Sequence, residues 1–214
     1  MDTNNSVQPS RLPDWLKPGW LLALFELLFI FLLAFTYEQT RERIAIQEQL
    51  RLEAQFREIL IAGSYDNEPA TDVLNIEGEK RTVYRVRLQG QPVAALFKTV
   101  AKDGYSGSIY LLIGIKTNGE LLGVRALAHR ETPGLGDEID LRRSNWVMNF
   151  TGRSLHNPTS DGWAVKKDGG IFDAFTGATI TPRAVVKAVH NALLYFDQNQ
   201  AMLFSIQADK SEQS

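Results

Sequence analysis

An apolar run near the N-terminus constrains this chain more than any other feature. Residues 20–37 hold one charged residue, Glu26, among large apolar side chains. At about 1.5 Å per residue, a helix of this length nearly crosses a hydrocarbon core of about 30 Å. Trp15 and Trp20 at one end and Tyr37 at the other are aromatics typical of a membrane interface. The run therefore predicts one transmembrane helix. A buried helix of a soluble protein seldom has large apolar groups on every face, and a signal peptide usually has a shorter apolar core.

The charges on either side of this run do not orient it. Two basic residues precede the run and four follow it, namely Arg11 and Lys17, then Arg41, Arg43, Arg51 and Arg57. The positive-inside rule weakens when a long domain follows the helix, so a short cytoplasmic N-terminus over residues 1–19 stays permitted. Glu26 within the span is compatible both with pairing to a partner helix and with protonation.

The composition excludes several functional classes. The 23 Lys+Arg against 25 Asp+Glu give a net charge of -2, which argues against a nucleic-acid-binding protein. The absence of cysteine excludes disulfides, thiolate zinc sites and cysteine-ligated iron–sulfur clusters. The histidines at 129, 156 and 190 lack the spacing of metal ligands, so we expect no metal site.

The rest of the chain predicts a helical stalk and an α+β domain. Residues 38–63 are dense in Glu, Arg, Gln and Leu, which predicts a helix that ends near Gly63. The domain over residues 64–206 begins with strand-like runs at 83–88, 93–97, 109–115 and 121–127. Turn residues at 90–92 and 118–119 separate adjacent runs and indicate hairpins.

A helix is predicted over residues 182–196. Its apolar face comprises Val185, Val189, Ala192, Leu193 and Phe196. Thr181 is expected to cap this helix, and Pro182 to occupy its first position. The polar segment 207–214 is expected to form a flexible tail.

Glycine and small polar residues gather in four places, one of which differs by its position. Residues 104–107, 131–136 and 168–170 are typical of ordinary loops. Residues 176–179, by contrast, directly precede the predicted helix, where free N–H groups and the helix dipole favour an anion such as phosphate. The alternative is a helix-entry turn without a ligand.

Several separated motifs occur in order behind the apolar run. They are Gly104-Tyr-Ser-Gly107, Gly123-Val-Arg125, His129-Arg-Glu-Thr-Pro-Gly-Leu-Gly-Asp137, Lys166-Lys-Asp-Gly-Gly170 and the segment from Asp173 to Arg183. Through them the chain resembles the G subunit of the Rnf-type (Rsx-type) ion-translocating electron transport complexes. More distantly, it resembles the C subunit of the sodium-translocating NADH:quinone reductase, although the segments 131–136 and 165–170 favour the first.

The resemblance implies a covalent flavin. In that family the last threonine of a Ser/Thr-Gly-Ala-Thr motif is esterified to the phosphate of FMN, which corresponds to Thr179 here. It also implies a recognition context for a flavin transferase, formed by Asp173, Thr176, Gly177 and Ala178. No catalytic residue is implied. Thr181 is a competing hydroxyl that we expect to cap the helix instead.

The resemblance further implies a flavin pocket without fixing its contacts. The candidates are Tyr105, Ser106, Glu131, Thr132 and Leu135. Tyr105 and Leu135 are expected to pack on the isoalloxazine, although both are equally typical of ordinary surface or core residues. Lys166 and Lys167 would offset phosphate charge, and His129 is expected to be a structural hydrogen-bonding partner.

As a whole, the resemblance implies an electron-carrying protein of a redox-driven ion pump (an ion-translocating oxidoreductase) without a substrate site of its own. It would sit in a bacterial inner membrane as a single-pass protein, with the domain on the periplasmic side. The expected partners are other membrane, flavin and iron–sulfur subunits and the flavin transferase. The alternatives are an FMN redox sensor or scaffold, and a cofactor-free anchored binding module, which would be colourless.

Overall fold

The computed structural model describes residues 17–61, 63–76 and 81–205. The chain divides into two units, residues 1–51 and 52–214, which are considered separately. Most of the predicted N-terminal segment and the predicted tail, residues 207–214, lie outside the described residues.

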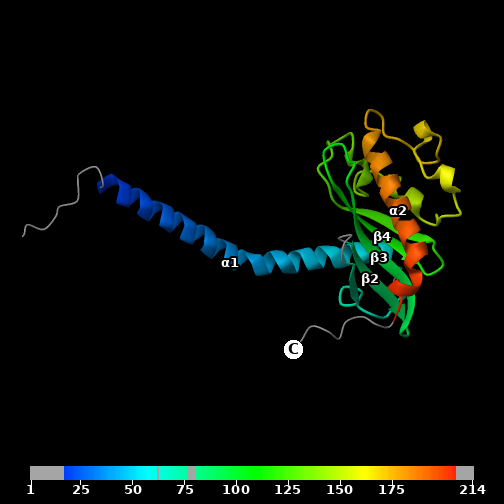
Figure 1. Cartoon of the computed structure of the whole chain (residues 1–214), viewed down its shortest axis with the longest axis horizontal. Coiled ribbons are helices and arrows are strands. Elements are labelled where there is room, and N and C mark those ends of the chain that lie inside the picture. The colour runs from blue at the N-terminus through cyan, green and yellow to red at the C-terminus, as the bar shows by residue number, and fades with distance from the viewer. Residues whose placement is uncertain (1–16, 62, 77–80, 206–214) are drawn as a thin grey trace, which may run out of the picture. The chain divides into compact units, whose positions relative to one another are not determined.

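A single long helix, α1, spans Lys17–Ile59 (Figure 1). The predicted membrane segment and residues 38–59 of the predicted stalk therefore lie in one continuous helix, which ends at Ile59 and not near Gly63 as predicted. Its apolar part has a mean hydropathy of 2.2 with none of its side chains buried, so length and composition suit a membrane span. Among the described residues, α1 is the one helix with these properties. The structure is thus consistent with membrane anchoring.

The second unit is built on an antiparallel sheet of five strands in sequential order. The strands are β1 Val73–Ile76, β2 Arg81–Leu88, β3 Gln91–Ala101, β4 Ile109–Lys116 and β5 Leu121–Ala128. The predicted runs correspond to β2 to β5, whereas β1 is too short to stand out in the sequence. Gln89 and Gly90 both have positive φ between β2 and β3, as a tight hairpin turn requires.

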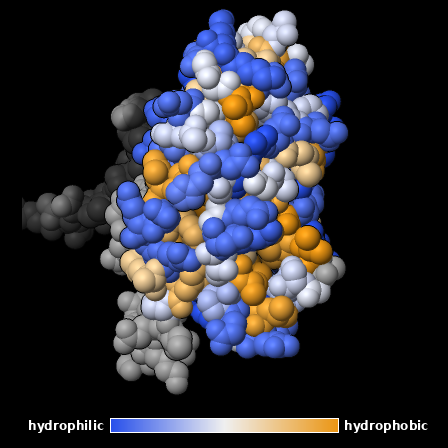
Figure 2. All heavy atoms as spheres, turned by 90° about the vertical axis from the view of Figure 1, so that its right-hand side faces the viewer, coloured by the Kyte–Doolittle hydropathy of each residue, from blue (hydrophilic) through white to orange (hydrophobic). Residues whose placement is uncertain are grey.

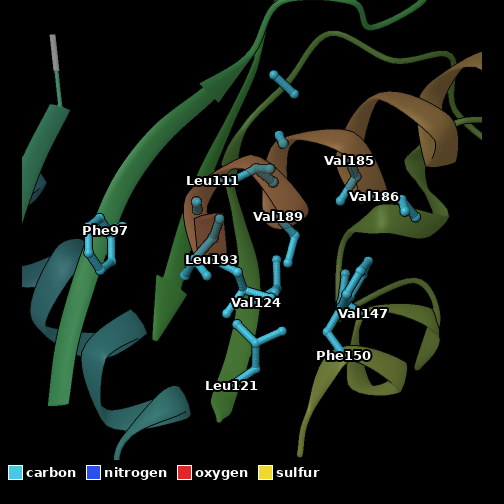
Figure 3. Close-up of a cluster of buried hydrophobic side chains, with 14 of the residues drawn as sticks. Phe97, Leu111, Leu121, Val124, Val147, Phe150, Val185, Val186, Val189 and Leu193 are labelled. Atoms are coloured by element: carbon cyan, nitrogen blue, oxygen red, sulfur yellow. The ribbon is translucent and has the colours of Figure 1, made fainter. Parts of the chain in front are cut away.

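Helix α2, Ile180–Leu203, covers one face of the sheet. Its predicted apolar face is confirmed, since all five of those side chains are buried. Figure 3 shows Val185, Val189 and Leu193 of α2 directed at the side chains of the strands, beside Val147 and Phe150. These last two belong to η3, Trp146–Phe150, one of four short 3₁₀ helices between β5 and α2. The others are η2 Asp137–Ile139, η4 Ser160–Gly162 and η5 Lys166–Asp168.

Figure 2 shows the face of the domain that lies at the right in Figure 1. This face is mostly hydrophilic. Hydrophobic side chains appear there only in small separate groups. This face therefore carries no extended apolar patch.

The opposite face of the sheet is covered by the last turns of α1. Phe56, Ile59 and Leu60 are buried there, in a cluster with Tyr84, Val86, Ala94, Leu96 and Leu112. Gly114 and Gly123 pair across β4 and β5 and leave room for Ile59. The end of α1 therefore forms part of the domain core.

Arg125 fixes this helix end electrostatically. Its side chain is only 7% exposed, and its Nε donates to the Glu58 carboxylate at 3.1 Å. Its Nη2 donates to the Glu58 carbonyl oxygen at 2.8 Å. A guanidinium on the last carbonyls of a helix satisfies acceptors that have no intrahelical partner and complements the negative end of the dipole.

Replacing Gly114 by alanine should lower the free energy of unfolding by about 1 to 3 kcal/mol, because overpacking forces neighbours to shift. The new Cβ would lie 2.6 Å from Cγ2 of Ile59. Gly123→Ala is the matched control, since its Cβ would meet nothing closer than 3.4 Å. Urea unfolding of the full chain in detergent measures both. Equal effects would contradict the packing of Ile59 into this groove.

A chain truncated to residues 52–214 should remain monomeric in solution, whereas one truncated to 64–214 should aggregate. The second loses Phe56, Ile59 and Leu60, each of which contributes about 1.5 to 3 kcal/mol by burial. It also exposes the apolar face beneath them. Size-exclusion chromatography and thermal unfolding compare the two. Equal stability would mean that the end of α1 is dispensable for the domain.

Candidate functional site

Two of the glycine-rich segments and the first turn of α2 meet at the side chain of Glu131. This carboxylate is buried, with 5% of the residue exposed. Its Oε1 accepts a hydrogen bond from the backbone N–H of Ser106 at 3.0 Å. Its Oε2 accepts a short hydrogen bond from the hydroxyl of Thr181. Glu131 therefore joins the loop 104–107 and the first turn of α2 to its own loop.

Two glycines make room for this carboxylate. A Cβ at Gly104 would collide with the Gly107 carbonyl oxygen and would lie 2.9 Å from Oε1 of Glu131. A Cβ at Gly136 would lie 3.0 Å from Oε2 of Glu131 and 3.0 Å from Oγ1 of Thr181. Gly104 and Gly136 thus leave room for the Glu131 side chain, which sequence composition alone does not reveal.

The loop 131–136 is closed by its own hydrogen bonds. The Thr132 carbonyl oxygen accepts from the N–H groups of Leu135 and Gly136 at 3.1 and 3.0 Å. The N–H of Gly134, which has a φ of 76°, donates to Oδ1 of the buried Asp137 at 2.7 Å. This internal bonding leaves the Thr132 and Leu135 side chains exposed at the surface.

The prediction for the start of α2 was wrong. The helix begins at Ile180 with Thr179 as its N-cap, so Thr181 is a helical residue of the first turn and not the cap. Thr181 is completely buried and bonded to Glu131. Pro182 lies third in the helix, a position that also tolerates it because N–H groups of the first turn have no intrahelical partner.

Thr179 lies at the junction of the turn and the helix. Its side chain is partly buried and makes no capping hydrogen bond. Gly177 precedes it with a φ of 80°, a left-handed conformation that favours glycine. The position of a Gly177 Cβ is 3.4 Å from Cδ2 of Leu135, so the loop 131–136 lies against this turn.

Exposed apolar side chains border the same region. Tyr105 is 69% exposed, Leu135 43% and Ile180 45%. Each belongs to one of the segments that Glu131 joins. Large apolar side chains exposed together beside a helix N-terminus favour a ligand with both an anionic and an apolar part.

The segment before α2 is held by polar contacts on one side and aromatic rings on the other. Lys166 Nζ lies 2.6 Å from Oδ1 of Asp173, with both side chains about 60% exposed. The Trp146 Nε1–H donates to the Asp173 carbonyl oxygen at 2.8 Å. The Trp146 ring also packs edge-on against Phe175, with centroids 5.1 Å apart. Lys166 therefore neutralises Asp173, and Lys167 is exposed next to it in the chain.

A second ion pair joins η5 to α2. The Arg183 guanidinium donates to both carboxylate oxygens of Asp168 at 2.6 and 2.8 Å. These hydrogen bonds hold the pKa of Asp168 below its usual range. Since both groups are exposed to solvent, we assign the pair an orienting role and no large contribution to stability.

A polar pocket of about 400 Å³ lies on another side of Glu131. It is lined by His129, Glu131, Pro133, Asp137, Asp140, Arg142 and Arg143. The His129 Nδ1 accepts from the N–H of Glu131 at 3.3 Å, which is the structural hydrogen-bonding role predicted for it. The Arg142 guanidinium donates hydrogen bonds from both Nε and Nη2 to the Asp140 carboxylate. These bonds hold the pKa of that carboxyl below its usual range.

The structure thus gathers most of the predicted site residues but assigns them different surroundings. Tyr105, Leu135 and Thr179 lie at or near the surface, whereas Glu131 is buried and each of its two oxygens accepts a hydrogen bond from a protein donor. Asp173 lies in the same segment, paired with Lys166. Sequence reasoning missed the pairing of Thr181 with Glu131, because a contact between residues 50 positions apart leaves no local pattern.

Known families match this chain in two regions. Residues 104–194 match the family described as FMN-binding domain, and residues 14–59 match the family described as RnfG N-terminal region. The first match begins at Gly104 and extends into α2. It therefore includes every segment that meets at Glu131.

Similar proteins cover nearly the whole chain. The G subunit of the ion-translocating oxidoreductase complex of Shewanella baltica (strain OS223) is 48% identical over 89% of this chain and 93% of that protein. The corresponding G subunit of Pseudomonas aeruginosa (strain UCBPP-PA14) is 48% identical over 89% of this chain and 92% of its own length. The crystal structure of Shewanella oneidensis NqrC is similar with a TM-score of 0.45 at 24% identity, covering 68% of this chain and 73% of that one.

Replacing Trp146 by phenylalanine should cost about 1 kcal/mol more than replacing Trp163, the contribution of one hydrogen bond. Trp163 is equally buried, and its Nε1 is the one buried side-chain nitrogen or oxygen in the described part of the chain that lacks a partner. Only Trp146→Phe should speed amide hydrogen exchange over residues 173–179, because only Trp146 donates to Asp173. Equal exchange in the two variants would contradict this anchoring role.

Proposed function

We propose that this chain, which belongs to the G-subunit family of ion-translocating oxidoreductase complexes, carries FMN covalently on Thr179. The chain is a membrane-associated, FMN-binding subunit of such a complex. The observation that carries the proposal is the placement of the Thr179 hydroxyl. It stands at the N-cap of α2 without a capping hydrogen bond, inside the region that matches the FMN-binding domain.

The three threonines of this segment differ in their suitability for esterification. Thr181 is completely buried, and its hydroxyl is bonded to Glu131. Thr176 is exposed but lies before Gly177, away from the helix. Thr179 combines partial exposure with the helix N-terminus, where a phosphodiester anion gains about 0.3 to 1 kcal/mol from the dipole. These differences favour Thr179.

The bond requires an activated flavin. Direct condensation of a hydroxyl with FMN releases a water molecule, and in aqueous solution the equilibrium of this reaction favours hydrolysis. The donor must therefore be a phosphoanhydride of FMN, such as FAD. The Thr179 oxygen bonds to the FMN phosphorus, the anhydride bond breaks and AMP leaves, and the hydroxyl proton passes to solvent or to the enzyme. A separate flavin transferase would catalyse this step, and the exposed residues 173 and 176–177 are accessible to it.

The chain's own residues would then hold the flavin. The α2 N-terminus would bind the phosphate, while the exposed side chains of Tyr105, Leu135 and Ile180 would offer apolar surface to the isoalloxazine. Glu131 would act through Ser106 and Thr181, since both of its oxygens already accept bonds from protein donors. When bound, FMN supplies the redox chemistry, and the protein fixes its position.

Within the complex, we propose that the protein relays electrons between other redox subunits. A covalently held carrier can face solvent or a partner without being lost, which suits a relay that has no substrate site of its own. The proposal includes a single membrane span, with the domain on the periplasmic side of a bacterial inner membrane. The similarity to G subunits over nearly the whole chain supports this assignment over the C subunit of the sodium pump.

Thr179→Ala should abolish covalent flavin while leaving the fold intact, since a partly exposed hydroxyl without a cap bond contributes little to stability. Thr176→Ala is the matched control and should retain the flavin. Full-length chains co-expressed with the transferase are compared by intact mass and by flavin fluorescence after denaturation. A flavin adduct that persists on the Thr179→Ala chain would contradict the assignment.

A further inference from the structure

We propose that Glu131 and Thr181 form a positioning pair that presents the Thr179 hydroxyl for flavin attachment and withholds that of Thr181. The inference rests on the proposed function and names what directs the modification to one threonine. Neither residue is catalytic. Both act through the conformation of the first turn of α2.

Few other hydrogen bonds hold the first turn of α2, and the ion pair that Arg183 of this turn forms with Asp168 is exposed to solvent. Thr179 makes no side-chain cap bond, and Pro182 has no N–H to donate. The bond from the Arg183 N–H to the Thr179 carbonyl oxygen is long, at 3.3 Å. No acidic residue lies in this turn. The hydrogen bond from the Thr181 hydroxyl to the buried Glu131 carboxylate therefore anchors this turn to the loop 131–136.

Glu131 can make this contact with Thr181 from only one position. Its two oxygens have different partners, the Ser106 N–H and the Thr181 hydroxyl. Gly104 and Gly136 enclose the carboxylate so closely that a Cβ at either would approach within 3.0 Å. A buried carboxylate that loses one such donor is left partly unsatisfied, which is costly. The pair therefore holds the helix turn in a single register relative to the loop.

This register separates the roles of two threonines that lie two positions apart. Thr181 points into the protein, where its hydroxyl is occupied. Thr179, on the same turn, keeps a partly exposed hydroxyl with no cap bond. A change in the first turn would move both hydroxyls together, so one contact determines which of them a transferase can reach.

The test measures flavin attachment to purified full-length apoprotein in detergent, with a flavin transferase and FAD. Thr181→Val preserves shape but removes the hydroxyl, and kcat for attachment should fall about tenfold or more, because misplacement of about 1 Å can cost that much. Thr181→Ser keeps the hydroxyl and should restore the rate. The matched control is Gln200→Ala, which removes an exposed hydrogen bond from α2 to the Thr117 carbonyl oxygen, far from the first turn.

Glu131→Gln provides an independent variant should Thr181→Val fail to fold. An amide cannot accept at both positions, since one of its ends donates, so the attachment rate should again fall. Peptide mapping of this variant should find less flavin on Thr179 than in the wild-type chain. Any new flavin adduct should lie on Thr181. Thermal unfolding of every apoprotein separates loss of fold from loss of positioning.

The outcomes distinguish the two proposals. If the wild-type chain takes no flavin from a transferase that is active on another substrate, the proposed function fails. If the wild-type chain is modified on Thr179 and folded Thr181→Val and Glu131→Gln react at the same rate, the positioning role is refuted. Equal loss in Gln200→Ala and Thr181→Val would also refute it, because the effect would then be general.

Discussion

The buried carboxylate of Glu131 is the interaction on which the candidate site depends. A charge withdrawn from water is tolerated only when hydrogen bonds replace its hydration. Here the replacement comes from Ser106 on one loop and Thr181 on α2, which lie far apart in the sequence. The requirement to satisfy both oxygens therefore brings together the segments that match an FMN-binding domain. The glycines around the carboxylate follow from the same requirement, since they provide its space.

A second constraint acts on the opposite face of the sheet. The last turns of α1 bury Phe56, Ile59 and Leu60, and Arg125 binds the helix end through Glu58. These residues at the end of α1 thus belong to the core of the second unit. Both faces of the sheet are covered by helices, and the glycine-rich segments lie between β3 and β4 or between β5 and α2.

Much of this organisation is predictable from the sequence, because it depends on local patterns. The apolar run and the polar segment after it predict helix where α1 lies, and hydrophobic patterning predicts the strands β2 to β5 and the buried face of α2; the structure confirms these elements. The start of α2 was mispredicted, because Thr181 and Pro182 form a typical helix-start sequence while tertiary bonding places Thr181 inside the helix. The roles of Glu131, Gly104 and Gly136 depend on contacts across the fold, and no local rule reveals them.

The most direct test of the account is to locate the flavin on the wild-type protein purified from its own membrane. Trypsin should release residues 168–183 as one peptide, which contains Thr176, Thr179 and Thr181. Fragmentation of this peptide should place a mass equal to FMN less one water on Thr179. An unmodified peptide, or an adduct on Thr176 or Thr181, would contradict the central claim that the α2 N-cap is the attachment site.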